Sequence, residues 1–496
     1  MTSNLKILSV EQMYEADSRT IQQGVSGKVL MENAGQGVTA FIEEGWDICR
    51  AAILCGPGNN GGDGYVIARA LRDAGWPVKV YAYGDVQKLS GDAEFMFQKI
   101  EGNVEPLTAL DLDQTDLVVD ALFGAGFRGA FPTEIETLFD TMQSKSISIV
   151  CVDVPSGMDG NSGEVAKGTP CADLTVSFCR PKTGHLFYPA IKNMGRFEVI
   201  DIGISDEIID DLKIQVFENA PDLWLDLLPV PSAMGHKYDR GHCTVMGGGL
   251  KSMGAARIAA RCALRSGAGA VTLLCAPSAL MAYSISLDAV MVQSLRDPED
   301  LGDWLATKRI ASILIGPGNG VSDRTRANVI EALKSKATVI LDADALTVFK
   351  DDPDLLFDKI SKKEVGHVIL TPHEAEFARI FEFEGTALER CQKAALRSGA
   401  IVVLKGASTI ISEPTGRTVI NTNATPWLAT AGSGDSLAGI ISGLIAASMP
   451  CFEATTMGVW MHGEAGIRFG PGLIAEDIEA QIPRILADLL EIITDE

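Results

Sequence analysis

The chain has 496 residues, of which 46% are hydrophobic, and this length is enough for two α/β domains of ordinary size. Its formal net charge of −23 argues against nucleic-acid binding, which needs a basic surface, and against docking on anionic membranes. The ten cysteines are scattered without a CxxC pair, which is typical of reduced thiols in a cytoplasmic protein.

The first predicted strand, residues 51–55, is followed by the stretch GPGNNGGDG at 56–64 and by a predicted helix from Tyr65. Such a strand, glycine-rich turn and helix N-terminus can bind an anion, because free amides and the helix dipole point at one spot. The glycines would allow a close backbone approach and positive φ angles. The stretch is neither a Walker A loop nor a Rossmann fingerprint. It predicts a phosphate-bearing ligand, with a tight connection that binds nothing as the alternative.

Strands and helices alternate along the rest of the chain, which predicts mostly parallel sheets covered by helices on both faces. The first series continues with predicted strands at 78–83, 117–121, 148–154, 174–178 and 197–202. After an acidic, proline-containing stretch, a second series has predicted strands at 242–246, 270–275, 311–315, 338–342, 367–371 and 400–404. We predict a first domain at 1–215, a linker at 216–235 and a second domain at 236–496.

Polar residues follow three predicted strands of the first domain, where an open parallel sheet binds its ligands. Asn59 and Asn60 follow the first strand, Asp120 ends the third, and the sequence DVPSG at 153–157 follows the fourth. Their oxygens are hard ligands, and because only Asp120 and Asp153 are charged, the set favours potassium over a divalent ion. Alternatively, these two aspartates only cap the following turns.

In the second domain, the sequence TAGSGD from Thr430 precedes an apolar helix. The amides at 432–435 can form an anion hole at the positive end of that helix. Asp435 would lie beside developing negative charge, so it is a candidate general base or acid. The apolar run at 437–447 is too short to span a bilayer and predicts a buried helix. No secretory leader is expected at the N-terminus.

Three further strand ends in the second domain carry polar residues. Lys405 is a candidate phosphate contact, and His373 begins a helix, where capping or packing is the preferred interpretation. Asp342 and Asp344 either bind a metal or, by preference, satisfy a strand end. The sequence Gly-Pro-Gly-Asn also recurs, at 56–59 and 316–319, which suggests one ligand site in each domain.

These motifs resemble two known families. LMENAG at 30–35, the glycine stretch and DVPSGMDGNSG resemble the NAD(P)H-hydrate epimerase family. The stretch at 254–273, IGPGNG, TPHEAEF, LKGAST and GSGD resemble the NAD(P)H-hydrate dehydratase branch of the ribokinase superfamily. The resemblance covers nearly the whole chain, in the order of the fused bacterial repair enzymes. It implies a Rossmann-like three-layer α/β/α domain followed by a ribokinase-like α/β domain.

The resemblance also implies a reaction. Hydrated NADH and NADPH would be the substrates: the first domain would interconvert their R and S epimers, and the second would dehydrate the S epimer. Dehydration would consume ADP, or alternatively ATP, together with Mg²⁺, and would release AMP and phosphate when ADP is used. A potassium ion in the first domain, a cytoplasmic location and a homo-oligomer are further expectations.

Individual site residues follow from the matched motifs. In the first domain the hydrate would contact Asn59, Asn60, Gly61, Gly62, Asp63, Gly124, Ala125, Gly126, Phe127, Arg128, Gly129, Ala130 and Asp153. Asp153 would transfer a proton, and potassium would be held by Asn60, Asp120 and Ser156. In the second domain the hydrate would contact Ala255, Gly318, His373 and the catalytic Asp435. The nucleotide would contact Lys405, Gly406, Ala407, Ser408, Thr409 and Gly434.

Two departures from the family pattern leave the preference for ADP or ATP open. The sequence KGAST has serine where a smaller residue is expected, and GPGNG lacks a leucine that often precedes the last glycine. The alternative function is a small-alcohol or vitamin kinase of the ribokinase superfamily with an N-terminal nucleotide-binding or scaffold domain. The cation-ready set of Asn60, Asp120, Asp153 and Ser156 argues against a mere scaffold.

Overall fold

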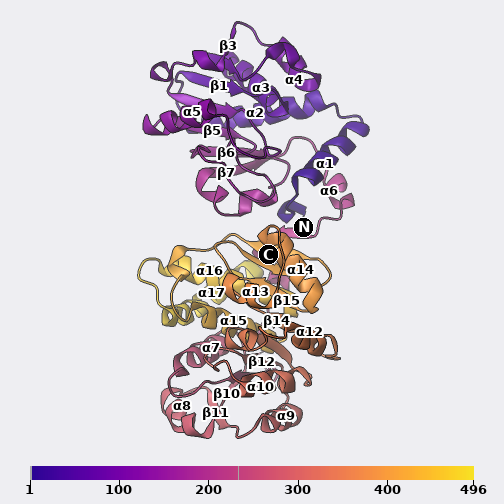
Figure 1. Ribbon diagram of the computed structural model, residues 1–496, viewed down its shortest axis with the longest axis vertical. Helices are drawn as coiled ribbons and strands as arrows, with labels where there is room; N and C mark the ends of the chain where they lie inside the picture. The colour runs from indigo at the N-terminus through magenta and orange to yellow at the C-terminus, as the bar shows by residue number, and fades with distance from the viewer. Residues whose placement is uncertain (1–2, 233, 496) are drawn as a thin grey trace. The chain divides into compact units, whose positions relative to one another are not determined.

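The computed structural model describes residues 3–232 and 234–495. The chain divides into two compact units between Ile214 and Gln215 (Figure 1). They are called unit 1 and unit 2 in chain order.

Unit 1 is built on a parallel seven-stranded sheet in the order β3-β2-β1-β4-β5-β6-β7. Its strands are β1 Ala51–Cys55, β2 Val78–Ala82, β3 Val104–Pro106, β4 Leu117–Ala121, β5 Ser148–Val152, β6 Leu174–Phe178 and β7 Arg196–Ile200. All residues of β1 and β4 are buried, because helices cover both faces of a parallel sheet. The short edge strand β3 was not predicted.

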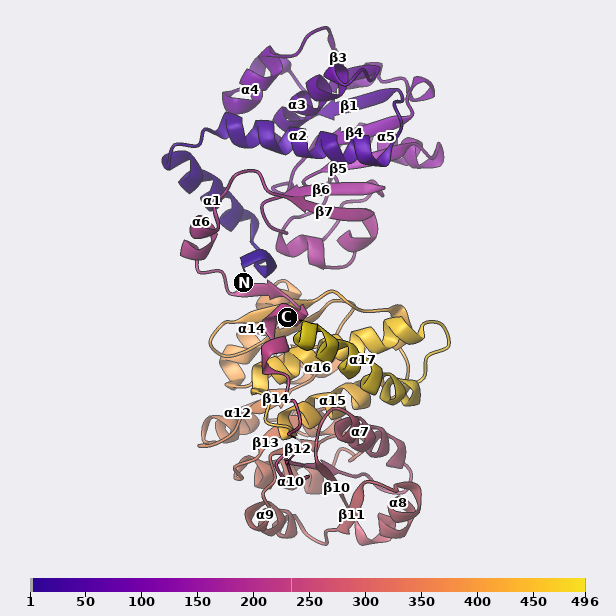
Figure 2. The same ribbon diagram turned by 180° about the vertical axis from the view of Figure 1, so that it is seen from behind.

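Helices form a layer on each face of this sheet (Figure 2). One layer contains α2 Gly27–Gly45, α3 Asn59–Asp73 and α4 Gly91–Gln98, with α1 Val10–Gln22 and α6 Asp206–Asp211 beside them. The other layer is α5 Thr133–Ser144. Because side chains alternate along a strand, Ile53 of β1 packs in the first layer's core and Leu54 in that of α5. The predicted three-layer α/β/α arrangement is confirmed.

Unit 2 is built on a ten-stranded sheet in the order β11-β10-β9-β12-β13-β14-β15-β16-β17-β8. The strands β9 to β15 are parallel to one another, whereas β16 is antiparallel to both β15 and β17. Their bounds are β8 Val216–Glu218, β9 His242–Met246, β10 Ala270–Cys275, β11 Met291–Ser294, β12 Ser312–Ile315, β13 Thr338–Leu341, β14 Val368–Leu370, β15 Ile401–Leu404, β16 Thr409–Ser412 and β17 Thr418–Asn421.

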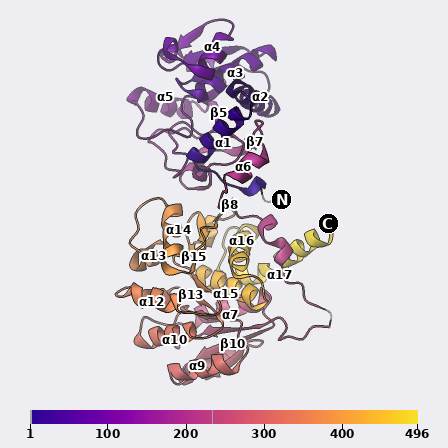
Figure 3. The ribbon, with the colours of Figure 1, turned by 90° about the vertical axis from the view of Figure 1, so that its right-hand side faces the viewer.

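Two groups of helices pack on this second sheet (Figure 3). The first group is α7 Met253–Arg265, α15 Ser433–Ala446, α16 Cys451–Phe469 and α17 Ala475–Asp495. The second is α10 Asp323–Leu333, α12 Pro353–Ser361, α13 Glu374–Ile380 and α14 Ala387–Ser398. The shorter helices are α8 Leu280–Ser286, α9 Pro298–Thr307 and α11 Asp344–Thr347.

Helix α15 is the predicted buried helix. A Cβ atom on Gly439 would lie 2.3 Å from the carbonyl oxygen of Ala259, and one on Gly443 would lie 2.2 Å from that of Ala263. The glycines therefore let α15 pack directly against the backbone of α7. Among the described residues, no helix is long and apolar enough to cross a membrane.

The segment predicted as a linker, 216–235, is in part a structural element of unit 2. Strand β8 pairs with β17 and covers an edge that would otherwise expose unpaired backbone groups. Farther along, Trp224 is 1% exposed, and its indole nitrogen donates to Oδ1 of Asn219 at 3.0 Å. The first half of the segment thus contributes backbone pairing and core to unit 2.

Candidate active sites

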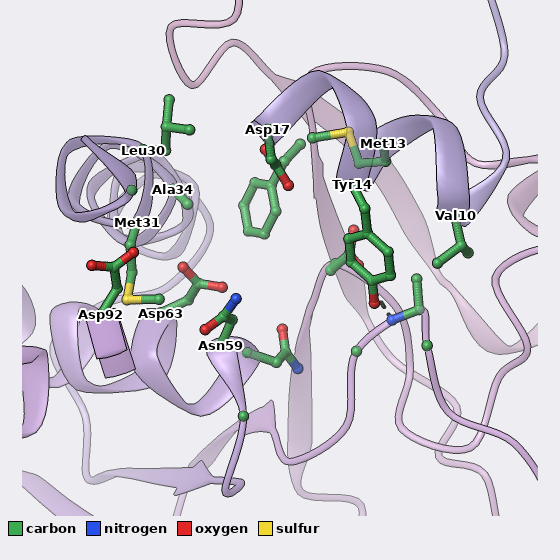
Figure 4. Close-up of a pocket in the computed structure, with 18 of the residues that line it drawn as sticks. Val10, Met13, Tyr14, Asp17, Leu30, Met31, Ala34, Asn59, Asp63 and Asp92 are labelled. Carbon is green, nitrogen blue, oxygen red and sulfur yellow. Dashed lines mark hydrogen bonds between the residues drawn. The ribbon is translucent and has the colours of Figure 1, made fainter. Parts of the chain in front are cut away.

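Unit 1 contains a cavity of about 560 Å³ at the carboxyl ends of its central strands. The strand order reverses between β1 and β4, and an open α/β sheet binds ligands at such a point. The predicted residues that line it are Asn59, Asn60, Asp63, Gly124, Ala125, Gly126, Phe127 and Asp153. Helix α1 forms a further wall, from which Asp17 points into the cavity, as does Asp63 from α3 (Figure 4).

Packing, and not a left-handed backbone, requires four of the five glycines at 56–64, whereas Gly58 has open space where a Cβ atom would lie. None of the five has a positive φ angle. A Cβ atom on Gly56 would lie 1.8 Å from the carbonyl oxygen of Leu122, and one on Gly61 would lie 2.0 Å from that of Gly56. Gly62 packs against the sulfur of Met31. The expectation of positive φ is therefore wrong here, and Gly61 and Gly62 lie behind the cavity wall.

The last three residues of the predicted loop 124–130 also lie outside the cavity lining. The guanidinium of Arg128 binds the carboxylate of Asp159 at 2.9 Å and the carbonyl oxygen of Phe127 at 2.7 Å. Gly129 and Ala130 are exposed. The cavity is thus lined by the first half of this loop, while Arg128 holds the second half in place.

Asp153 is the most constrained polar residue of the cavity. It follows β5 with φ +65°, a left-handed conformation that costs energy in a residue with a side chain. Its Oδ1 accepts from Nζ of Lys182 at 2.7 Å and from Oγ of Ser177 at 2.8 Å. Burial would raise the pKa of Asp153, but the ammonium of Lys182 holds the pKa below its ordinary value. Asp153 is therefore an ionised carboxylate in a buried ion pair.

His185 fixes the backbone at Asp153. Its Nδ1 accepts from the amide of Lys182 at 2.9 Å, so the ring proton lies on Nε2, which donates to the carbonyl oxygen of Asp153 at 3.0 Å. Burial and the charge of Lys182 lower the pKa of His185 to about 4, so the ring is neutral. The sequence reasoning missed both Lys182 and His185. They follow β6 at the same edge of the sheet, so the expectation that ligands bind at the carboxyl ends of strands could have found them.

Two of the three predicted cation ligands, Asp120 and Ser156, are hydrogen-bonded to each other, and the third, Asn60, lines the cavity. Asp120 is fully buried; its Oδ1 accepts from Oγ of Ser156 at 2.7 Å and its Oδ2 from the Ser156 amide at 2.9 Å. Oδ1 also accepts from the amide of Leu122 at 3.2 Å, so the capping role is real as well. The buried Nδ2 of Asn60 has no hydrogen-bond partner among the described residues. One carboxylate with hydroxyl and amide oxygens suits a monovalent cation.

A site for a divalent metal ion would need several charged or metal-binding side chains in one place. Within the described part of the chain, no three or more His, Cys, Asp or Glu side chains are grouped to hold a metal ion. The aspartates weighed as metal ligands have protein partners instead: Asp342 binds Lys405, and Oδ2 of Asp344 accepts from the amide of Gly320 at 2.7 Å. They satisfy a strand end, as preferred.

In unit 2 the second Gly-Pro-Gly-Asn turn does use positive φ angles. They are +133° at Gly316, +65° at Gly318 and +80° at Gly320. Oγ of Ser252, the residue before α7, donates to the carbonyl oxygen of Gly318 at 2.6 Å. This bond brings two predicted hydrate contacts into one neighbourhood, because Ala255 lies in the first turn of α7.

Lys405 approaches the N-terminus of α15, where Asp435 lies in the first turn. A Cβ atom on Gly434 would lie 3.3 Å from Nζ of Lys405, so the glycine admits the ammonium to the first turn of the helix. Nζ of Lys405 binds Oδ1 of Asp342 at 2.7 Å. Burial and the charge of Asp342 raise the pKa of Asp435 to about 7, although Lys405 acts in the opposite direction. A carboxyl with this pKa can accept or donate a proton at neutral pH.

His373 lies beside Lys405, and the other predicted nucleotide contacts of its loop follow it in the chain. Nδ1 of His373 accepts from the amides of Ala375 and Glu376 at 3.1 and 3.3 Å, so His373 caps α13 as preferred. The backbones of His373 and Lys405 also form an isolated parallel bridge. Gly406 and Ala407 are exposed, Ser408 is half-buried, and Thr409 begins β16.

Sequence reasoning missed two residues of this site. The hydroxyl of Thr371 donates to Oδ1 of Asp342 at 2.8 Å and helps to hold the partner of Lys405. His462 of α16 lies with Nε2 3.0 Å from the carbonyl oxygen of Ser433. Thr371 directly follows β14, whereas the proximity of His462 has no signal in the local sequence.

Comparisons with known proteins agree with this two-site arrangement. A family model described as NAD(P)H-hydrate dehydratase matches residues 243–484, and one described as YjeF-related protein N-terminus matches residues 27–184. The bifunctional NAD(P)H-hydrate repair enzyme of Moorella thermoacetica is 33% identical and aligns over 93% of each chain. That of Thermofilum pendens is 30% identical over 98% of this chain and 97% of its own. The chain belongs to the bifunctional NAD(P)H-hydrate repair enzyme family.

A solved structure supports the assignment of unit 2 to this family. The ADP/ATP-dependent NAD(P)H-hydrate dehydratase of Bacillus subtilis, co-crystallised with ATP and Mg²⁺, is 26% identical, with a TM-score of 0.50. The match covers 55% of this chain and 98% of that chain. The family resemblance and the two-domain α/β fold class predicted from the sequence are confirmed.

Proposed function

We propose that this member of the family repairs hydrated NADH and NADPH in two steps. Unit 1 interconverts the R and S epimers of the hydrate, and unit 2 dehydrates the S epimer with ADP, releasing AMP and phosphate. The observation that carries the second step is the position of Asp435 in the first turn of α15, which Nζ of Lys405 approaches at Gly434.

The dehydration turns a poor leaving group into a good one. Asp435 accepts the proton of the hydrate's hydroxyl, whose oxygen attacks the terminal phosphoryl group of the nucleotide and displaces AMP. The amides of the first turn of α15 stabilise the negative charge that develops. The lone pair of the ring nitrogen then expels phosphate, and loss of a ring proton restores the dihydronicotinamide.

In this proposal the residues of unit 2 have separate tasks. Ala255, Gly318 and His373 contact the hydrate. Lys405 and its loop through Thr409 contact the nucleotide together with Gly434, and Mg²⁺ bound to the nucleotide neutralises phosphate charge. ADP is the preferred nucleotide and ATP the alternative; the similar dehydratase of Bacillus subtilis is ADP/ATP-dependent.

In unit 1 the hydrate occupies the cavity, with Asn59, Asn60, Asp63 and the loop from Gly124 in contact with it and Asp153 in the proton transfer. Potassium is held by Asn60, Asp120 and Ser156, where it supplies a positive charge beside the cavity. Replacing potassium by tetramethylammonium is then expected to slow epimerisation and to leave dehydration unchanged. Equal epimerisation rates with both cations would contradict the potassium site.

We also propose a cytoplasmic location and a homo-oligomeric state for the enzyme. All ten cysteines are free thiols, which suits a reducing cytoplasm. We expect a homo-oligomer, which light scattering of the purified chain would distinguish from a monomer.

The proposed function is tested by following absorbance at 340 nm after the protein is added to both NADH-hydrate epimers with ADP and Mg²⁺. Wild type should recover NADH from both epimers. Asp153→Ala should consume the R epimer only at its spontaneous rate. If no nucleotide-dependent NADH appears, the dehydratase proposal fails and a screen of alcohol substrates for kinase activity follows.

A further inference from the structure

Four carboxyl groups line the cavity of unit 1, those of Asp17, Asp63, Asp92 and Asp153, and the proposed epimerisation has used neither Asp17 nor Asp92. Asp17 lies on α1, where the residues that line the cavity share one helical face at 10, 13, 14, 17 and 21. Figure 4 shows Val10, Met13 and Tyr14 along this face and the carboxyl of Asp17 pointing into the cavity between α1 and α3. It is a single charge in an otherwise apolar and aromatic stripe.

This carboxyl has no partner in the described part of the chain: it accepts no hydrogen bond and forms no ion pair there. It is also half-buried. A desolvated carboxyl without a partner destabilises a fold, and such groups concentrate at sites where they act on a ligand. A structural role for Asp17 would require a partner, as Glu15 on the same helix has in Arg19 at 2.7 Å.

The surroundings of Asp17 set its protonation. The titratable groups that face it are Lys182, Asp153, Asp63, Cys179 and, on its own helix, Tyr14. Burial and the negative charge of Asp153 outweigh the attraction of Lys182 and raise the pKa of Asp17 to about 6. Asp153 stays ionised in its ion pair, whereas the carboxyl of Asp17 is half protonated near pH 6 and mostly ionised at pH 7. Burial raises the pKa of Asp63 in the same cavity as well.

We propose that Asp17 is a catalytic acid of epimerisation, acting from α1 while Asp153 acts as the base from the sheet edge. This inference rests on the proposed function of unit 1. The hydroxyl-bearing carbon of the hydrate is bonded to the ring nitrogen. Asp153 takes the hydroxyl proton and Asp17 gives a proton to that nitrogen, so the carbon–nitrogen bond breaks and an aldehyde forms.

Ring closure completes the epimerisation. Rotation about the neighbouring carbon–carbon bond presents the opposite face of the aldehyde to the nitrogen. The nitrogen attacks the carbonyl carbon, returns its proton to Asp17, and the oxygen recovers its proton from Asp153. The other epimer is formed with no net change in protons, and no oxidant, reductant or co-substrate is consumed.

The test compares wild type with Asp17→Asn and the control Glu15→Gln, which makes the same charge change at an exposed position of α1. Interconversion of purified NADH-hydrate epimers is measured without nucleotide from pH 5.5 to 8.5, after subtraction of the spontaneous rate. Wild-type and control rates should fall about tenfold per pH unit above 6, because the acid form of Asp17 is lost. Asp17→Asn should be about 100-fold slower at pH 6, with no such fall.

Two controls distinguish the loss of a catalytic acid from unfolding of the variant. Nucleotide-dependent dehydration of the S epimer by unit 2 should be unchanged in Asp17→Asn, and the melting temperature of the chain should not fall. If the amide variant unfolds, Asp17→Glu decides instead, since it retains a titrating carboxyl and should keep the fall above pH 6.

The outcomes are distinct. An Asp17→Asn enzyme that keeps the wild-type rate, or that keeps the pH dependence at a lower rate, would overturn the role of Asp17 while epimerisation itself stands. A wild-type enzyme that does not interconvert the epimers would remove the proposed function of unit 1, and this inference with it.

Discussion

Each unit places an aspartate near a lysine at the carboxyl edge of its sheet, but the lysine binds differently in the two. In unit 1, Lys182 contacts Asp153 itself. In unit 2, Lys405 binds Asp342, and Asp435 has only the more distant influence of the same ammonium. The result is a lowered pKa at Asp153 and a pKa of about 7 at Asp435. In these two sites, a nearby lysine keeps an aspartate ionised only when it binds that aspartate directly.

The largest expected effect comes from removing the carboxyl of Asp435 in unit 2. Asp435→Asn should slow dehydration by about 1,000-fold, because an amide cannot take the hydroxyl proton. Epimerisation in the same chain should be unchanged, which separates the two sites. The 340 nm assay with the S epimer and ADP measures the loss, and Asp351→Asn, at an exposed position, is the control. Dehydration within tenfold of wild type would exclude Asp435 as the base.

The two glycine-rich turns give a comparison of stability. Gly56→Ala should cost about 3 kcal/mol, because its new Cβ atom meets the backbone of Leu122. Gly58→Ala meets nothing within 4 Å and should change stability by less than about 0.5 kcal/mol. Gly320→Ala in unit 2 also has open space, but its φ of +80° should cost about 1 kcal/mol. Urea denaturation of the full chain checks this order, and equal costs for Gly56 and Gly58 would contradict it.

Removing Lys182 of unit 1 tests whether its ion pair keeps Asp153 ionised. Lys182→Met leaves Asp153 buried without its cation, so the pKa of Asp153 should rise and its ionised fraction should fall. We expect epimerisation about 100-fold slower at pH 6, because a smaller fraction of Asp153 is ionised and able to take the hydroxyl proton. The exposed Lys192→Met is the control. A rate that stays at the wild-type level would mean that the ion pair has no part in the reaction.

The smallest predicted effect is a difference in pH dependence between the two activities. Dehydration needs the deprotonated form of Asp435, so its rate should rise up to tenfold per pH unit below 7 and level off above that. Lys405→Met removes the charge that lowers the pKa of Asp435, and should move this limb to higher pH. Initial rates with saturating ADP and S epimer measure both pH profiles. If the rise in rate below pH 7 does not move in Lys405→Met, the rise belongs to the titration of another group.

Much of the fold could be predicted because strands buried on both faces are continuous apolar runs, as in β1 and β4. The strands that were missed are short or lie toward an edge, such as β3 and the half-exposed β11. The rule that ligands bind at the carboxyl ends of strands found Asp153, and applied after β6 it would also have found Lys182. Asp435 was found from the Gly-Ser-Gly sequence that begins α15. Asp17 could not be found this way, because its place depends on where α1 packs against the sheet, which no local pattern encodes.

Strand β8 also bears on how the protein can be divided into parts. It follows the last residue of unit 1 almost directly, yet it is the outermost strand of the sheet in unit 2. A fragment started at residue 236, after the apparent linker, would lack β8 and Trp224 and would present the backbone of β17 to other molecules. Exposed edges of this kind invite intermolecular pairing, so such a fragment would aggregate. A gene cut just before residue 215 would keep β8 paired with β17, and each half could then be expressed and assayed by itself.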